Sequence, residues 1–130
     1  MNAAGMPASI VRPARLRRGD IIGVCSPSFP AHVHFREKYM HGVRELEACG
    51  FGVVEGALTR AATAQGYRTG SPQARADELM GLFENASVRA IITTIGGATS
   101  ASLIPYLDGA SGIPVGRTGT PGWPRRSLSA

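Results

Sequence analysis

Apolar positions along the chain change their spacing from one segment to the next, and this change predicts alternating strands and helices. Residues 21–25 form an apolar run of five, which is typical of a strand buried on both faces. Residues 35–49 have a helical period instead, because their large apolar side chains share one stripe while charged side chains fall elsewhere. Gly50 follows the last turn, where a left-handed cap favours glycine, so we predict that the helix ends there. The apolar stripe of this helix consists of Tyr39, Met40, Val43 and Leu46.

The same pattern predicts two further strands and two further helices. Residues 51–55 and 89–95 are predicted strands, and residues 56–70 between them have no clear period and are predicted to be a loop. Ser71-Pro72 predicts a helix start, because serine caps free amides and proline at the first helical position loses no hydrogen bond. A short helix is expected from Thr99 or Ser100 toward Leu103 and Ile104. The order β-α-β-α-β-α predicts an α/β fold of three layers, with a parallel sheet, helices on its faces and right-handed crossovers.

Composition and charge then narrow the classes of partner. The formal net charge is +5, but residues 19–108 carry seven basic and nine acidic residues, a net charge of −2. The excess lies in residues 1–18, a predicted flexible basic leader, and in residues 109–130, which have no period and are predicted to be disordered. A nucleic-acid partner is therefore not expected, since such binding needs Lys and Arg clustered on one face. No apolar run approaches the length of about eighteen residues that spans a membrane, and residues 21–25 are too short for a signal-peptide core, so we expect a cytoplasmic protein without a membrane partner.

Cysteine and histidine give no sign of a metal or cofactor. Cys25 and Cys49 lack metal spacing, and we predict both to be reduced and partly buried. His32, His34 and His41 lie close together, but no carboxylate or cysteine completes a ligand set, so solvated histidines are predicted. Glycine fingerprints of dinucleotide or phosphate loops are also absent, which leaves nucleotide binding without positive support.

Two predicted loops lie where a parallel sheet binds its ligands, beyond the carboxyl ends of the strands. Ser26-Pro27-Ser28 follows the first strand, and Gly96-Gly97 followed by Thr99 and Ser100 comes after the third. The amides of Gly96 and Gly97 are candidates for an oxyanion hole, although a tight strand-to-helix turn explains the two glycines equally simply. Ser26 and Ser28 are candidates for the substrate loop, and turn or cap residues are the alternative interpretation.

Several short motifs follow one another along the chain in an order that resembles a known protein family. Gly19-Asp20 precedes the first strand, and Pro27-Ser28 follows it. Residues 71–79 read Ser-x-x-x-Arg-Ala-x-x-Leu, and Ala90-Ile91-Ile92 leads into Gly96-Gly97. The remaining motifs are Leu46, Gly50-Phe51, Val53-Val54 and Leu103-Ile104-Pro105-Tyr106-Leu107-Asp108. Over about residues 16–108 this order resembles the LD-carboxypeptidase family, and Thr94-Ile95-Gly96-Gly97 with Ser100 and Ser102 resembles its branch containing the microcin C self-immunity peptidase.

The resemblance implies a serine peptidase of two domains, an amino-terminal α/β domain and a carboxyl-terminal β-rich domain with the site between them. In this family a serine in a Gly-Tyr-Ser-Asp-like elbow attacks the amide carbonyl, and a glutamate and a histidine of the second domain complete the triad. The substrates are murein tetrapeptides cut between an L- and a D-residue or, in the immunity branch, peptidyl or aminoacyl adenylates. No metal or other cofactor is needed, and the parent enzyme is expected to form a homodimer.

Residues 109–130 depart from the family pattern. They contain no Gly-x-Ser-Asp elbow, so no catalytic serine, glutamate or histidine is assigned, and only the glycine pair is carried over, with Gly97 preferred. We therefore expect an incomplete amino-terminal domain over residues 19–108, a truncated or frameshifted tail over residues 109–130, and a chain that is inactive by itself.

A second hypothesis is a free-standing α/β module that binds a small ligand or a protein without catalysis. It requires a carboxyl terminus that closes the sheet or caps the core, and residues 109–130 show no such pattern. The sequence leaves open whether the parent enzyme acts on murein peptides or on adenylated peptides, and it does not determine the oligomeric state.

Overall fold

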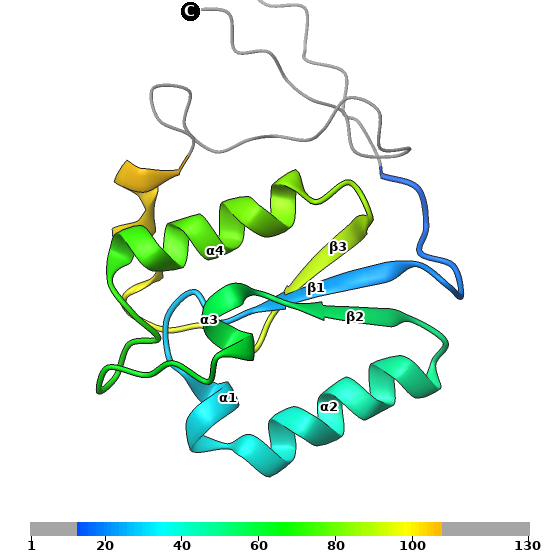
Figure 1. Cartoon of the computed structure of the whole chain (residues 1–130), viewed down its shortest axis with the longest axis horizontal. Helices are drawn as coiled ribbons and strands as arrows, with labels where there is room; N and C mark the ends of the chain where they lie inside the picture. Colours follow the sequence, from blue (N-terminus) through cyan, green and yellow to red (C-terminus); the bar gives the residue numbers. More distant parts are fainter. Residues whose placement is uncertain (1–12, 108–130) are drawn as a thin grey trace, which may run out of the picture.

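A computed structural model describes residues 13–107 as a three-stranded parallel sheet with helices on both faces (Figure 1). The strands are β1 (Ile21–Cys25), β2 (Gly52–Glu55) and β3 (Val88–Thr93), in the order β2-β1-β3. The predicted α/β class with a parallel sheet is confirmed. The helices are α1 (Ala31–His34), α2 (Arg36–Ala48), α3 (Ala57–Arg60), α4 (Pro72–Glu84) and the 3-10 helix η1 (Ser100–Tyr106).

Two details differ from the sequence prediction. Residues 56–70, predicted to be a loop, contain the four-residue helix α3, which is too short to produce a period. The third strand ends at Thr93 and not at residue 95, and Ile95 is exposed. The tail over residues 109–130, and residues 1–12 of the leader, lie outside the described residues.

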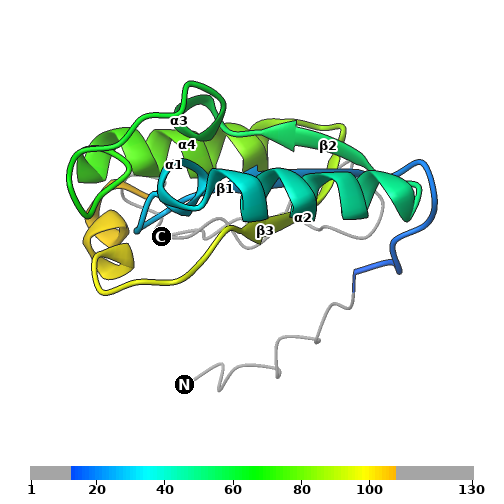
Figure 2. The same ribbon diagram turned by 90° about the horizontal axis from the view of Figure 1, so that it is seen from below.

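The core is divided by the sheet into two faces. Ile22 and Val24 pack with Tyr39 of α2 on one face, and Cys25 packs with Leu82 of α4 and Val88 on the other. Figures 1 and 2 show α2 and α4 on opposite sides of the sheet, which gives the three predicted layers. Four of the five β1 residues are buried, as expected for a central strand covered on both faces.

Helix α4 begins as the sequence predicts. Ser71 is its N-cap and accepts a hydrogen bond from the amide of Ala74 over 3.1 Å, and Pro72 occupies the first turn. A third apolar cluster joins α4 to η1 through Ala76, Leu103 and Leu107. This cluster fixes the segment after β3 against the helix, at the carboxyl ends of the strands.

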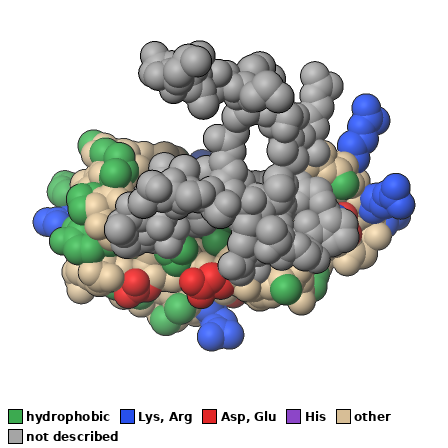
Figure 3. Space-filling model, turned by 90° about the horizontal axis from the view of Figure 1, so that it is seen from above, with side chains coloured by type: hydrophobic (Ala, Val, Ile, Leu, Met, Phe, Trp, Pro, Cys, Tyr) green, Lys and Arg blue, Asp and Glu red, His purple; other side chains and the backbone are tan. Residues whose placement is uncertain are grey.

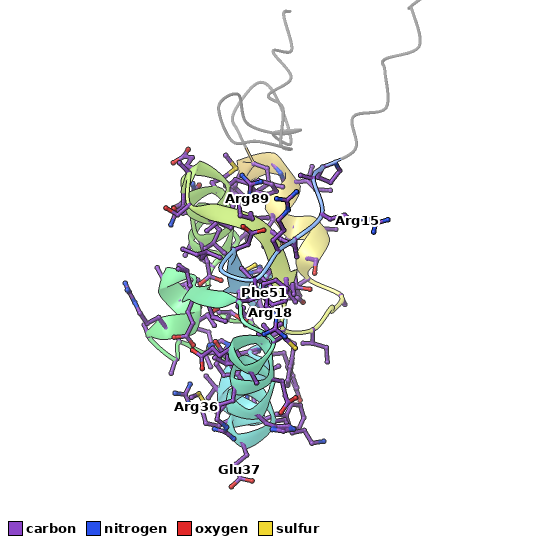
Figure 4. The ribbon with its side chains drawn as sticks, turned by 90° about the vertical axis from the view of Figure 1, so that its right-hand side faces the viewer. Arg15, Arg18, Arg36, Glu37, Phe51 and Arg89 are labelled. Carbon is purple, nitrogen blue, oxygen red and sulfur yellow. The ribbon has the colours of Figure 1, made fainter. Side chains whose placement is uncertain are left out.

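The opposite end of the sheet carries arginines. Figure 4 shows Arg18 beside Phe51 and Arg89 nearer to Arg15 at this end, while Arg36 and Glu37 project from α2. In the part of the face left uncovered in Figure 3, Lys and Arg side chains stand in small separate groups. Among the described residues no helix is long and apolar enough to cross a membrane.

Gly56 offers a test of the packing between β2 and α4. A Cβ at this buried position would lie 2.4 Å from Cγ and 2.5 Å from Cδ of Glu78, whose buried side chain has little room to move. We expect Gly56→Ala to lower the free energy of unfolding by about 1–3 kcal/mol, as overpacked cores do, measured by urea denaturation. Gly81→Ala is the matched control, because nothing lies within 4 Å of its added Cβ in α4, and it should raise stability by about 0.5–1 kcal/mol. Equal effects of the two substitutions would contradict the described packing.

Candidate functional site

The loops that follow β1 and β3 meet at the carboxyl edge of the sheet. The amide of Thr94 donates to the carbonyl of Cys25 over 2.9 Å, and the hydroxyls of Ser26 and Thr94 lie 2.9 Å apart. The two candidate loops are neighbours because β1 and β3 pair in parallel, so both strands end at the same edge.

Gly97 lies directly against Ser28. Ser28 Oγ is 2.8 Å from Thr99 Oγ1 and accepts a hydrogen bond from the Thr99 amide over 3.3 Å. A Cβ on Gly97 would lie 2.3 Å from Ser28 Oγ, whereas a Cβ on Gly96 would meet nothing within 4 Å. Gly97 is therefore required for the close approach of the two loops, and Gly96 is not.

The amides at the turn after β3 are available to a ligand. Gly96, Gly97 and Ala98 are exposed, and their N–H groups donate to no other group within the described part of the chain. Free amides beside one another at a strand end are the kind of donors that hold an oxyanion. Thr99 and Ser100 are half-buried, with Ser100 Oγ donating to the Gly97 carbonyl over 3.2 Å.

Ser26 and His32 form a buried pair. Ser26 Oγ lies 2.8 Å from His32 Nδ1, the distance of a nucleophile from its base, but both residues have no exposed surface. The pair therefore connects structural elements and cannot meet a substrate in this conformation. Ser28 is also buried, so neither candidate serine is presented as a nucleophile.

The predicted solvated state of His32 is wrong, because α1 folds this residue under the loop after β1. Its Nε2 has no hydrogen-bond partner. Burial lowers the pKa of His32, and the nearby backbone of Thr63 and the charge of Glu78 oppose this only in part. His34 and His41 are exposed, as predicted.

Two charged residues of α4 complete the site, and sequence reasoning assigned neither. Glu78 accepts the amides of Ser26 (3.2 Å) and Thr59 (2.9 Å), and the Thr59 hydroxyl also donates to it over 3.2 Å. Arg75 donates from Nη1 to the carbonyls of Pro27 (2.7 Å) and Thr99 (3.0 Å). Both side chains are buried, with Arg75 only 1% exposed. The sequence did contain a sign that these two residues are buried. Arg75 and Glu78 border the apolar stripe of the helix, because Arg75 lies four residues before Leu79 and Glu78 four residues before Leu82.

The cysteines and histidines do not assemble a metal site. Within residues 13–107 no group of three His, Cys, Asp or Glu side chains could hold a metal ion. Cys25 is buried, and burial followed by the charge of Glu78 raises the pKa of its thiol to about 12. Cys49 is exposed, so the prediction that both cysteines are partly buried is wrong for this residue, which lies just after the end of α2.

An apolar cavity of about 520 Å³ lies between α2 and β3. It reaches the candidate site through Thr94 and Ile95, which directly precede Gly96. Phe35, Ile92 and Ile95 are exposed at this cavity. Lys38 is the one charged residue among its lining residues.

Comparison with known proteins places this geometry in context. Residues 22–113 match the family described as the LD-carboxypeptidase N-terminal domain. A Vibrio cholerae protein named as a carboxypeptidase is 44% identical over 90 residues, covering 69% of this chain and 26% of that protein. The microcin C7 self-immunity protein MccF of Escherichia coli is 41% identical over 95 residues, covering 73% of this chain and 27% of that protein.

Solved structures agree with these relatives. Wild-type MccF without ligand superposes with a TM-score of 0.71 at 40% identity, covering 75% of this chain and 28% of that chain. MccF in complex with aspartyl sulfamoyl adenosine gives the same TM-score of 0.71. An MccF-like protein of Bacillus anthracis gives a TM-score of 0.63 at 33% identity, covering 74% of this chain and 29% of that chain. The chain thus spans less than a third of the length of these relatives.

The buried histidine predicts a pH dependence of stability. Because folding lowers the pKa of His32 below the value of about 6.5 in an unfolded chain, the unfolded state takes up a proton first as pH falls. The contribution of His32 is therefore complete above about pH 6.5 and is lost as pH falls below it. We expect His32→Gln to reduce the loss of unfolding free energy between about pH 7.5 and about pH 5, measured by urea denaturation.

His34→Gln is the matched control for this experiment, because His34 is exposed and should leave the pH dependence as in the unmodified chain. An identical pH dependence in the His32 and His34 variants would contradict the assignment of His32 as a buried neutral group.

Proposed function

The chain belongs to the LD-carboxypeptidase family, and from this premise we propose that it forms the amino-terminal, oxyanion-binding part of a serine-type peptidase site. The observation that supports this proposal is the row of free, exposed amides at Gly96, Gly97 and Ala98, at the carboxyl edge of the sheet. In hydrolysis of an amide or acyl bond, these amides would stabilise the negative charge that develops on the carbonyl oxygen.

The burial of Ser26 and Ser28 indicates which step of the reaction this chain would contribute. Ser26 and Ser28 are buried and already hydrogen-bonded, so the nucleophile is not among them. The sequence contains no Gly-x-Ser-Asp elbow and the described part presents no exposed serine beside a base. We therefore propose that these 130 residues bind a substrate carbonyl without cleaving it, and that residues 19–108 are the part of the family domain that does so.

The substrate class we favour is a peptidyl or aminoacyl adenylate. MccF is about 40% identical to this chain, and its structures include a complex with aspartyl sulfamoyl adenosine. The second candidate is a murein tetrapeptide cut between an L- and a D-residue, which the family description LD-carboxypeptidase favours. In either case the working setting would be the cytoplasm, the reaction would need no metal, and the active assembly would be a homodimer of the parent enzyme.

Binding of a non-hydrolysable adenylate analogue tests the proposal. Aspartyl sulfamoyl adenosine is titrated into the ¹⁵N-labelled chain, and the amide signals of residues 96–99 are followed. We expect saturable shifts in these signals, and affinity at least about tenfold weaker for Gly97→Ala, because the added Cβ displaces Ser28 and moves the amides. Gly96→Ala is the control and should bind within about twofold of the unmodified chain, since its Cβ meets nothing.

The remaining outcomes separate the hypotheses. A Ser28→Gly and Gly97→Ala double variant should recover affinity, because the clashing side chain is gone. Shifts caused by a murein tetrapeptide but not by the adenylate analogue would favour the murein peptide as the substrate class in place of the adenylate. Shifts confined to Val43 and Ile95 in the cavity would favour a binding module, and no shift with either probe would refute the proposal.

Inertness of the isolated chain is checked separately. Incubation with aspartyl adenylate should release aspartate no faster than in buffer alone. Release above that background would contradict the proposal, and its loss in Ser26→Ala would then assign the nucleophile to the Ser26–His32 pair.

A further inference from the structure

Arg75 is a buried arginine whose guanidinium donates only to neutral acceptors and not to a carboxylate. Besides the carbonyls of Pro27 and Thr99, its Nε donates to the Gly70 carbonyl (2.9 Å) and its Nη2 to Ser102 Oγ (3.0 Å). All these acceptors are neutral, and within residues 13–107 no carboxylate oxygen pairs with this guanidinium. A buried cation without a carboxylate is costly, so its hydrogen bonds to these neutral loop groups must offset that cost.

A single nitrogen of this guanidinium joins the two candidate loops. Nη1 donates both to Pro27, which precedes Ser28, and to Thr99, which lies two residues after Gly97. The loops are then joined a second time by the hydrogen bonds between Ser28 and Thr99. Gly97 lies between these fixed points, and a Cβ added to it would be only 2.3 Å from Ser28 Oγ. The planar fork of arginine donates in several directions at once, which the single ammonium of lysine cannot reproduce.

We infer that Arg75 is a positioning residue for the Gly97 amide, setting the separation of the loops after β1 and β3 so that the row of free amides can receive an oxyanion. This inference rests on the proposed function. The positive charge of Arg75, which has no carboxylate partner, also lies under the same turn, where it favours an anionic ligand over a neutral one. Arg75 itself touches the loop backbone and is not a catalytic residue.

The test compares Arg75→Lys with two controls in the full 130-residue chain. Val88→Ala lowers stability by truncating a buried core side chain away from the loops, and Arg44→Gln removes one positive charge from the exposed face of α2. Three readouts are taken for each: unfolding by urea, the amide shifts of Gly96, Gly97 and Thr99, and affinity for aspartyl sulfamoyl adenosine. Ser102→Ala, which removes one acceptor of the guanidinium and the hydrogen bond from Ser102 Oγ to the Thr99 carbonyl, is a milder fourth variant that should still fold.

We expect Arg75→Lys to move the Gly97 and Thr99 signals and to weaken probe binding by at least about tenfold, while Val88→Ala and Arg44→Gln leave both unchanged. Ser102→Ala should move the same signals by less and weaken binding by about two- to threefold. Unmoved Gly97 and Thr99 signals in the Arg75 and Ser102 variants would overturn the inference and leave Arg75 a purely structural residue. If the unmodified chain binds no probe, the proposed function fails, but the amide shifts still decide whether Arg75 positions Gly97.

Discussion

The site depends on giving hydrogen-bond partners to the backbone amides and carbonyls at the place where two loops leave the same edge of the sheet. Ser26 and Thr59 are buried and Pro27 and Thr99 are half-buried, and a buried backbone group left unsatisfied costs about 1–3 kcal/mol. Helix α4 meets both needs with opposite charges placed three residues apart: Glu78 accepts the amides, and Arg75 donates to the carbonyls. Because α4 also packs against the sheet and η1, the same helix that builds the core determines where both loops lie.

The fixed loops explain the different constraints on the two glycines. Once the Pro27 and Thr99 carbonyls share one guanidinium nitrogen, Ser28 and Gly97 are brought so close that a Cβ on Gly97 has no room. A Cβ on Gly96 would meet nothing, so only Gly97 of the two glycines is required by the close packing. The Gly96-Gly97 pair is therefore more than a flexible turn. The amides of Gly96, Gly97 and Ala98 remain unpaired because the loop contacts involve Thr99 and Ser28 instead. Rigid support beneath and free donors above are what preorganised binding of an oxyanion requires.

The sequence predicted the features that depend on local patterns. The parallel strands, the start of α4 at Ser71 and the family follow from periodicity and ordered motifs, and each is confirmed. Arg75 and Glu78 were not assigned and His32 was predicted to be solvated, because side chains of these types are normally solvated and only the folded loops bury them. The early end of β3 was also not predicted, and the hydroxyl of Thr94 just beyond it contacts Ser26, a residue 68 positions away in the chain. The motif that contains Arg75 was recognised by resemblance, but a motif alone does not say which atoms its arginine contacts.

Electrostatics connects the fold to the kind of ligand it would accept. The positive charge of Arg75 is surrounded by dipoles that reduce its field without cancelling it, and the interior of a protein screens charge far less than water does. The free amides of residues 96–98 add their own dipoles at the same turn. Glu78, the buried negative charge of α4, instead accepts hydrogen bonds from the amides of Ser26 and Thr59, which stabilise its charge. In the proposed function, the unpaired amides of this turn and the charge of Arg75 behind it would favour an anionic group such as a phosphate, a carboxylate or an oxyanion.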